Sequence, residues 1–233
     1  MTEEDWISLA DPQPMLAYLR GSASDRKLRL FAVACCRSLG EELPGPHFHD
    51  AISLAEQFAD GEASGDRLFN PWDLVSHPEK LPSQCQRSIA QAIHWTARMA
   101  QPAYESWTRD EPFDLPLWAE RVSRSLIDAA QGDDRVRTSY ALRAAERCAQ
   151  ADLIRDIFGN PLQPETIDPR WLTTNVVDLS RLIYSERLFD RMPILSDALM
   201  DAGCDAEAIL QHCRSGLPHT RGCWVVDLLT GKK

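Results

Sequence analysis

The sequence predicts an all-α protein, an irregular multi-helix bundle or array around one central buried helix at about residues 25–39. Three observations carry this prediction. Apolar residues recur at steps of three and four along most of the chain, which is the spacing of one helix face. The segments with that spacing begin at capping residues or proline and mostly end at glycine. No window alternates apolar and polar residues long enough to require a sheet, and a small strand near residues 224–226 is the open alternative.

The central helix is expected in the stretch 24–39. Ser24 or Asp25 can cap its first turn, and one face is apolar at helical steps. Further apolar residues fill most of the remaining circumference, so we expect neighbours on several sides. The first face carries Leu28, Phe31, Ala32, Cys35 and Leu39, and the rest of the circumference carries Leu30, Val33, Ala34 and Cys36. Only a narrow polar edge remains, and it holds Arg26, Arg29 and Arg37.

The other helices are expected in order on both sides of the central one. Two short helices precede it, one after Thr2 and one that runs from Asp11 and Pro12 to Gly21. The later segments with helical spacing or capping signals are 49–61, 83–99, 116–132, 133–158, 173–183, 192–202 and 205–212. Proline and glycine interrupt residues 61–82, where one helical turn is expected near Trp72 and Leu74. We expect a single helical domain over residues 1–233, with a variable middle section at 61–135.

Charge and cysteine content exclude several classes of protein. The formal net charge is −10 and no basic stripe is visible, so we expect no nucleic-acid binding. The first residues are acidic where a signal peptide is basic, and no apolar run reaches bilayer length, so we expect no membrane association. The seven cysteines are an odd number in a chain too long to need disulfides, which fits reduced thiols. These features predict an acidic protein of the cytoplasm.

Four groups of residues stand out at the two ends of the chain: 23–37 (ASDRKLRLFAVACCR), 157–161 (IFGNP), 193–199 with 201–204 (PILSDAL and DAGC) and 219–227 (HTRGCWVVD). Together they resemble a family of uncharacterised bacterial proteins. The middle section, 61–135, is less similar. The resemblance implies a single defined fold in a bacterial protein. It implies no activity and no catalytic residue.

The densest group of reactive side chains lies near the C-terminus and comprises Cys204, His212, Cys213, His219 and Cys223. Thiolates and imidazoles are zinc ligands, but this spacing is not a standard one, and the neighbours His212 and Cys213 diverge by about 100° on a helix. A nucleophilic pair of Cys223 with His219 is a second hypothesis, although no third orienting group is recognisable. Packing of Cys204 and Cys223 as small apolar side chains, with His219 hydrogen-bonded beside a turn, is favoured, so the sequence assigns no metal and no cofactor.

The polar edge of the central helix offers another kind of candidate site. Arg26, Arg29 and Arg37 lie beside a buried face, where guanidinium groups need carboxylate partners or an anionic ligand. Because the chain has 35 acidic residues, internal ion pairs are favoured. His219 and Arg221 complete the set of candidate binding residues.

Many amphipathic helices without a recognisable catalytic constellation favour a binding surface over an active site. We therefore expect a non-catalytic protein-interaction or regulatory module with a protein partner. The alternative is a metal- or thiol-dependent enzyme that uses the region from Cys204 to Cys223. Metal analysis of the purified protein separates these two hypotheses.

Overall fold

A computed structural model describes residues 1–40, 46–63, 84–99, 115–129 and 137–233. Within these residues all regular structure is helical, with eleven α-helices, two 3-10 turns and no strand. The all-α prediction is therefore confirmed. The α-helices are α1 (Glu3–Ser8), α2 (Pro12–Leu19), α3 (Asp25–Arg37), α4 (Pro46–Ala59), α6 (Gln84–Met99), α7 (Leu115–Ala129), α8 (Arg137–Phe158), α9 (Thr174–Glu186), α10 (Met192–Asp201), α11 (Glu207–Arg214) and α12 (Trp224–Thr230). The 3-10 turns are η4 (Pro169–Trp171) and η5 (Phe189–Arg191).

The chain divides into two compact units. Unit 1 comprises Met1–Ser8 and Asp152–Lys233, and unit 2 comprises Leu9–Ala151. The boundary between them falls within α8. The single helical domain stays a prediction, and the variable middle section at 61–135 lies in large part outside the described residues.

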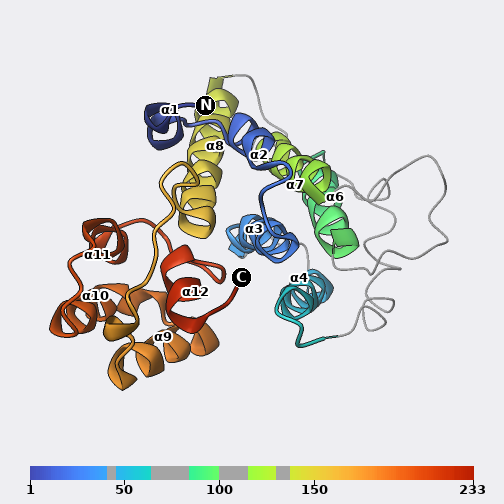
Figure 1. The fold of residues 1–233 in the computed structure, drawn as a ribbon. Coiled ribbons are helices and arrows are strands. Elements are labelled where there is room, and N and C mark those ends of the chain that lie inside the picture. The colour runs from blue at the N-terminus through green and yellow to red at the C-terminus, as the bar shows by residue number, and fades with distance from the viewer. Residues whose placement is uncertain (41–45, 64–83, 100–114, 130–136) are drawn as a thin grey trace. The chain divides into compact units, whose positions relative to one another are not determined.

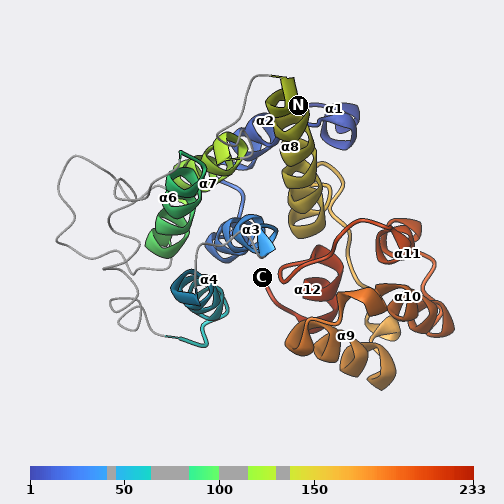
Figure 2. The ribbon, with the colours of Figure 1, turned by 180° about the vertical axis from the view of Figure 1, so that it is seen from behind.

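Helix α3 is the centre of unit 2. The side chain of Ser24 caps it by accepting a hydrogen bond from the backbone N–H of Lys27 at 3.3 Å. Eight of its 13 residues are buried. Helices α4, α6 and α7 all pack against it, and both views show α3 among them (Figures 1 and 2). The predicted central helix with neighbours on several sides is confirmed.

Unit 1 has a core of its own, built mainly by α9 to α12. Helix α9 packs against α10 and α12, and α11 packs against the same two helices (Figure 1). Thr173, one of two threonines that could cap this helix, caps α9 by accepting a hydrogen bond from the N–H of Val176. The side chains in this core include Val176, Ile183, Met192, Leu195, Leu199, Ile209, Val225, Val226 and Leu229. This packing fixes the ends of α11 and α12, which carry the site described below.

One predicted helix boundary and one predicted alternative need correction. Helix α4 begins at Pro46 and not at His49 or Asp50, because proline suits the first turn of a helix, where its missing N–H is not needed. The segment near Trp224 is helical, so the alternative of a small strand is wrong: Asp227 donates its N–H to the Cys223 carbonyl at 2.9 Å, a helical bond. The expected turn near Trp72 and Leu74 lies outside the described residues.

Candidate metal centre

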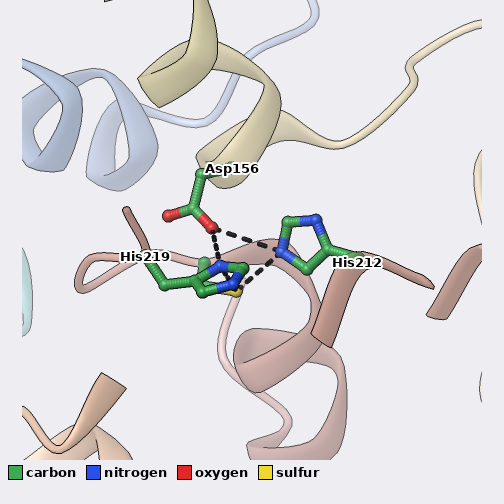
Figure 3. A group of neighbouring side chains, drawn as sticks. Asp156, His212 and His219 are labelled. Atoms are coloured by element: carbon green, nitrogen blue, oxygen red, sulfur yellow. Dashed lines mark hydrogen bonds and ion pairs between the residues drawn. The ribbon is translucent and has the colours of Figure 1, made fainter. Parts of the chain in front are cut away.

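Four side chains of unit 1 meet at one point, although they come from separate parts of the chain. Asp156 lies in the last turn of α8, and His212 lies in the last turn of α11. His219 belongs to the segment between α11 and α12, and Cys223 immediately precedes α12. Figure 3 shows both imidazole rings turned toward the same oxygen of the Asp156 carboxylate. One ligand-type atom from each of the four residues lies within 4.8 Å of all the others.

The contacts among these atoms are short. Nδ1 of His219 lies 2.6 Å from Oδ1 of Asp156, and Nε2 of His212 lies 3.2 Å from the same oxygen. Nε2 of His212 also lies 3.2 Å from Sγ of Cys223, and Nδ1 of His219 lies 4.0 Å from that sulfur. The rings of His212 and His219 meet edge to face, with centroids 4.8 Å apart. The arrangement therefore has one nitrogen from each histidine, one oxygen and one sulfur around a common centre.

The outer atoms of two of these side chains have partners of their own. Oδ2 of Asp156 accepts a hydrogen bond from the backbone N–H of Thr220 at 2.9 Å. Nε2 of His219 lies 3.4 Å from the hydroxyl of Ser215. Such outer contacts hold the carboxylate plane and the imidazole ring in fixed orientations, as they do around metal ligands in proteins.

Burial and charge act on Asp156 in opposite directions. The side chain is 2% exposed, and burial alone would raise the pKa of its carboxyl group. The hydrogen bonds and charges of His212 and His219 outweigh burial, so the pKa of Asp156 is lowered from its ordinary value. The residue is therefore a carboxylate at neutral pH, able to accept hydrogen bonds or to bind a cation.

Cys223 is fully buried, and this burial raises the pKa of its thiol well above the ordinary value. The negative charge of Asp156 acts in the same direction, and the backbone amides of Val225 and Val226 act against it. A catalytic cysteine needs an accessible, stabilised thiolate. The Cys223 thiol is not accessible, and its raised pKa keeps it protonated unless a cation binds the thiolate.

The histidine contacts differ from those of a catalytic relay. In a cysteine-histidine-aspartate triad, one ring nitrogen contacts the thiol and the other contacts the carboxylate. Here the same nitrogen of His212 contacts both Cys223 and Asp156, and the same holds for Nδ1 of His219. A proton cannot be relayed across the ring in this geometry. Convergence of all four donor atoms is instead what a bound metal ion requires.

The structure brings together only part of the cysteine and histidine group found in the sequence. His212, His219 and Cys223 are at the centre, whereas Cys204 and Cys213 are buried in the apolar core of unit 1. Cys204 packs as a small apolar side chain, as predicted, and His212 diverges from Cys213. Cys223 was predicted to pack in the same way; it is buried in this core, but its sulfur also contacts His212. Burial raises the pKa of Cys213 to about 12, so it is a neutral thiol.

Asp156 was missed by sequence reasoning. It lies 63 positions before His219, far beyond the range of spacing rules. One signal was present, because Asp156 is an acidic residue between Ile154 and Ile157 on the buried face of α8. A charged group at such a position needs a partner.

The arginine candidates of unit 2 have carboxylate contacts. They are Arg26 Nε to Asp60 Oδ1 at 2.9 Å, Arg29 Nη2 to Asp25 Oδ2 at 3.8 Å and Arg37 Nη2 to Glu56 Oε2 at 3.0 Å. Burial lowers the pKa of Arg29, and the nearby Asp25 opposes that shift. These contacts are the internal ion pairs that the sequence favoured. A binding role for the three arginines stays a prediction.

Arg221 follows His219 closely in sequence, but its recorded contacts are with α9 and not with the four residues of the centre. Its guanidinium group donates to the carbonyl groups of Tyr184 and Ser185, at 3.3 and 3.2 Å, and lies over the Tyr184 ring. A cation suits the carbonyl end of a helix such as α9. Its predicted binding role is not tested by these contacts.

The fold and the centre together define an all-α protein with four convergent side chains of metal-ligand type in unit 1. No protein-family model, curated protein or solved structure matches the chain. None of the described helices combines the length and the apolar character needed to cross a membrane.

Proposed function

We propose that the protein is a zinc-binding helical module, in which one Zn²⁺ held by Asp156, His212, His219 and Cys223 stabilises unit 1. The observation that carries the proposal is the convergence of four donor atoms from four residues, all within 4.8 Å of one another. The sequence assigned no metal, because three of these residues have no standard spacing and the fourth is remote from them.

The donor set favours zinc. Imidazole nitrogen, thiolate sulfur and carboxylate oxygen are the three ligand types of Zn²⁺ in proteins, at about 2.0–2.3 Å, which places neighbouring donors of a tetrahedron about 3.3–3.6 Å apart. Two of the contacts, both 3.2 Å, are close to this spacing. The His219–Cys223 contact of 4.0 Å would shorten by about 0.4 Å as the four donor atoms, which lie within 4.8 Å of one another, close on the ion. The hydrogen bond of 2.6 Å between Asp156 and His219 would open by about 0.7 Å as zinc replaces its proton.

Four protein ligands favour a structural role for the metal. Catalytic zinc sites keep a coordination position for water or substrate, whereas structural sites are closed by protein ligands. The side chains of Asp156, His219 and His212 are only 2%, 4% and 15% exposed, and Cys223 is fully buried. A closed and buried centre supports the non-catalytic module over the metal- or thiol-dependent enzyme.

We further propose that this module belongs to the bacterial family that the sequence resembles, and that it acts in the cytoplasm as an interaction or regulatory protein. The net charge of −10 supports a protein partner over a nucleic acid, whose phosphates it would repel. Salt-sensitive retention of the protein on heparin at neutral pH would contradict this part of the proposal.

Metal analysis of the purified full chain tests the zinc centre. We expect one Zn²⁺ per chain, and we expect Cys223→Ser and His219→Ala to lose it. The matched controls are Cys148→Ser and His49→Ala, which change an exposed cysteine and an exposed histidine in unit 2 and should retain the metal.

A spectroscopic measurement on the wild-type protein covers the case in which the ligand variants fail to fold. Titration with Co²⁺ should give the d–d bands of a tetrahedral site and a thiolate-to-metal charge-transfer band from Cys223. A metal-free wild-type protein that binds neither Zn²⁺ nor Co²⁺ at micromolar concentration would overturn the proposal.

A further inference from the structure

A tryptophan packs directly against one ligand of the proposed zinc centre. The indole ring of Trp224 lies against the imidazole of His212, with centroids 5.0 Å apart and planes tilted by 55°. Trp224 directly follows Cys223, a second ligand, and begins α12. His212 is the most exposed of the four ligand side chains, at 15%. Trp224 therefore adds a packing contact on the His212 ring to the contacts that its Nε2 makes with Asp156 and Cys223.

The indole of Trp224 also lies close to a glycine. Gly159 directly follows α8 and has a φ of +65°. A Cβ atom added there would lie 3.1 Å from Cγ of Trp224, so the indole lies as close to this backbone as packing allows. Gly159 thus sets the distance of Trp224 from the end of α8, three residues after the ligand Asp156.

Helix α1 is attached to this same turn. Trp6 is 1% exposed, and its Nε1–H donates to the carbonyl of Gly159 at 2.9 Å. In the reverse direction, Nε of Arg155 donates to the backbone carbonyl of Trp6 at 3.0 Å. Glu3 accepts hydrogen bonds from Asn160 and Gln163, at 3.0 and 2.7 Å. The first residues of the chain therefore hold the turn that supports Trp224.

We propose that Trp6 and Trp224 are positioning residues of the zinc centre. Trp6 fixes the turn at Gly159, this turn fixes Trp224, and Trp224 fixes the imidazole of His212. The inference rests on the proposed zinc site, and it adds that α1 sets zinc affinity although it supplies no ligand. Outer residues of this kind matter because metal binding needs ligands held in place before the ion arrives.

Zinc affinity measured by competition with a chelator tests the inference. Trp6→Phe keeps an aromatic ring and removes the hydrogen bond to Gly159, and Trp224→Phe reduces the surface against His212. We expect both variants to bind zinc about 10- to 100-fold more weakly than the wild type. Ile7→Ala is the matched control, because Ile7 is also in α1 but is 62% exposed, and its affinity should not change.

A second readout separates positioning from a general loss of stability. In the Co²⁺-loaded protein, a displaced His212 changes the d–d bands, whereas a folded variant that is only less stable keeps the wild-type spectrum. If Trp6→Phe does not fold, Glu3→Ala removes only the contacts to Asn160 and Gln163 and should weaken zinc binding in the same direction.

Each outcome decides a different point. Wild-type zinc binding with unchanged affinity and unchanged Co²⁺ spectra in Trp6→Phe and Trp224→Phe would overturn this inference and leave the zinc centre standing. A wild-type protein that binds no zinc would overturn the zinc centre and this inference with it.

Discussion

Replacing Gly159 by alanine should destabilise unit 1 strongly, for two reasons that can be separated. A residue with a Cβ atom in the left-handed conformation costs about 1–2 kcal/mol, and Gly159 has a φ of +65°. The new methyl group would also lie 3.1 Å from the Trp224 ring, and overpacking of this kind costs about 1–3 kcal/mol. We therefore expect Gly159→Ala to lower the free energy of unfolding of unit 1 by about 2–5 kcal/mol.

Gly203 provides the matched control. It also follows a helix of unit 1, α10, and has a φ of +85°, but a Cβ atom there would meet no other atom within 4 Å. Gly203→Ala should therefore cost only the backbone contribution, about 1–2 kcal/mol. The difference between the two variants measures the contact of Gly159 with Trp224.

Hydrogen exchange of backbone amides in unit 1, measured in increasing urea, is the appropriate assay. A chain with two compact units need not unfold in one step, so a single melting curve would mix their stabilities. Equal losses in Gly159→Ala and Gly203→Ala would refute the close packing of Trp224 on the end of α8. An unchanged unfolding free energy of unit 1 in Gly159→Ala would refute it as well.

Two further predictions concern ionic groups. Arg37→Met removes the ion pair with Glu56, whose side chain is 2% exposed, and should lower the unfolding free energy of unit 2 by about 1–3 kcal/mol, measured by hydrogen exchange of unit 2 amides in increasing urea. Arg20→Met breaks the more exposed pair with Glu120 and should cost less than about 1 kcal/mol, so equal losses would contradict the reasoning. Zinc binding should release protons at neutral pH, because burial raises the pKa of the Cys223 thiol and zinc binds the thiolate. Zinc affinity should therefore fall as the pH is lowered, and calorimetric titrations should show a binding enthalpy that depends on the buffer; identical enthalpies in buffers of different ionisation enthalpy would contradict this.

The parts of the fold that could be predicted are those determined by local patterns. The buried α3 followed from apolar spacing over several turns and from the capping residue Ser24. Helix α12 could not be assigned with the same certainty, because Trp224, Val225 and Val226 are also typical of strands and its seven residues are too few for periodicity to decide. In the structure this helix packs against α9 and α11, and the sequence alone does not show these tertiary contacts.

The centre shows the same division between local and distant information. His212, His219 and Cys223 were singled out because they are close in sequence and of ligand type. Standard spacing rules did not recognise them, because they come from the end of α11, an irregular segment and the residue before α12. The sequence marks Asp156 only as an acidic residue on an apolar helix face, and its contact with the two histidines depends on where the end of α8 lies, which no pattern within one sequence encodes.

The division of unit 1 between the two ends of the chain affects the order of folding during synthesis. Residues 1–8 are synthesised before unit 2, but the turn at Gly159 that receives Trp6 is synthesised only after the whole of unit 2. Helix α1 is too short to be stable alone, so it has no contact with its final neighbours until the turn at Gly159 has been synthesised. Unit 2 can collapse in the meantime, and closing the chain around a folded insert requires less loss of conformational entropy than closing a fully unfolded loop of the same length.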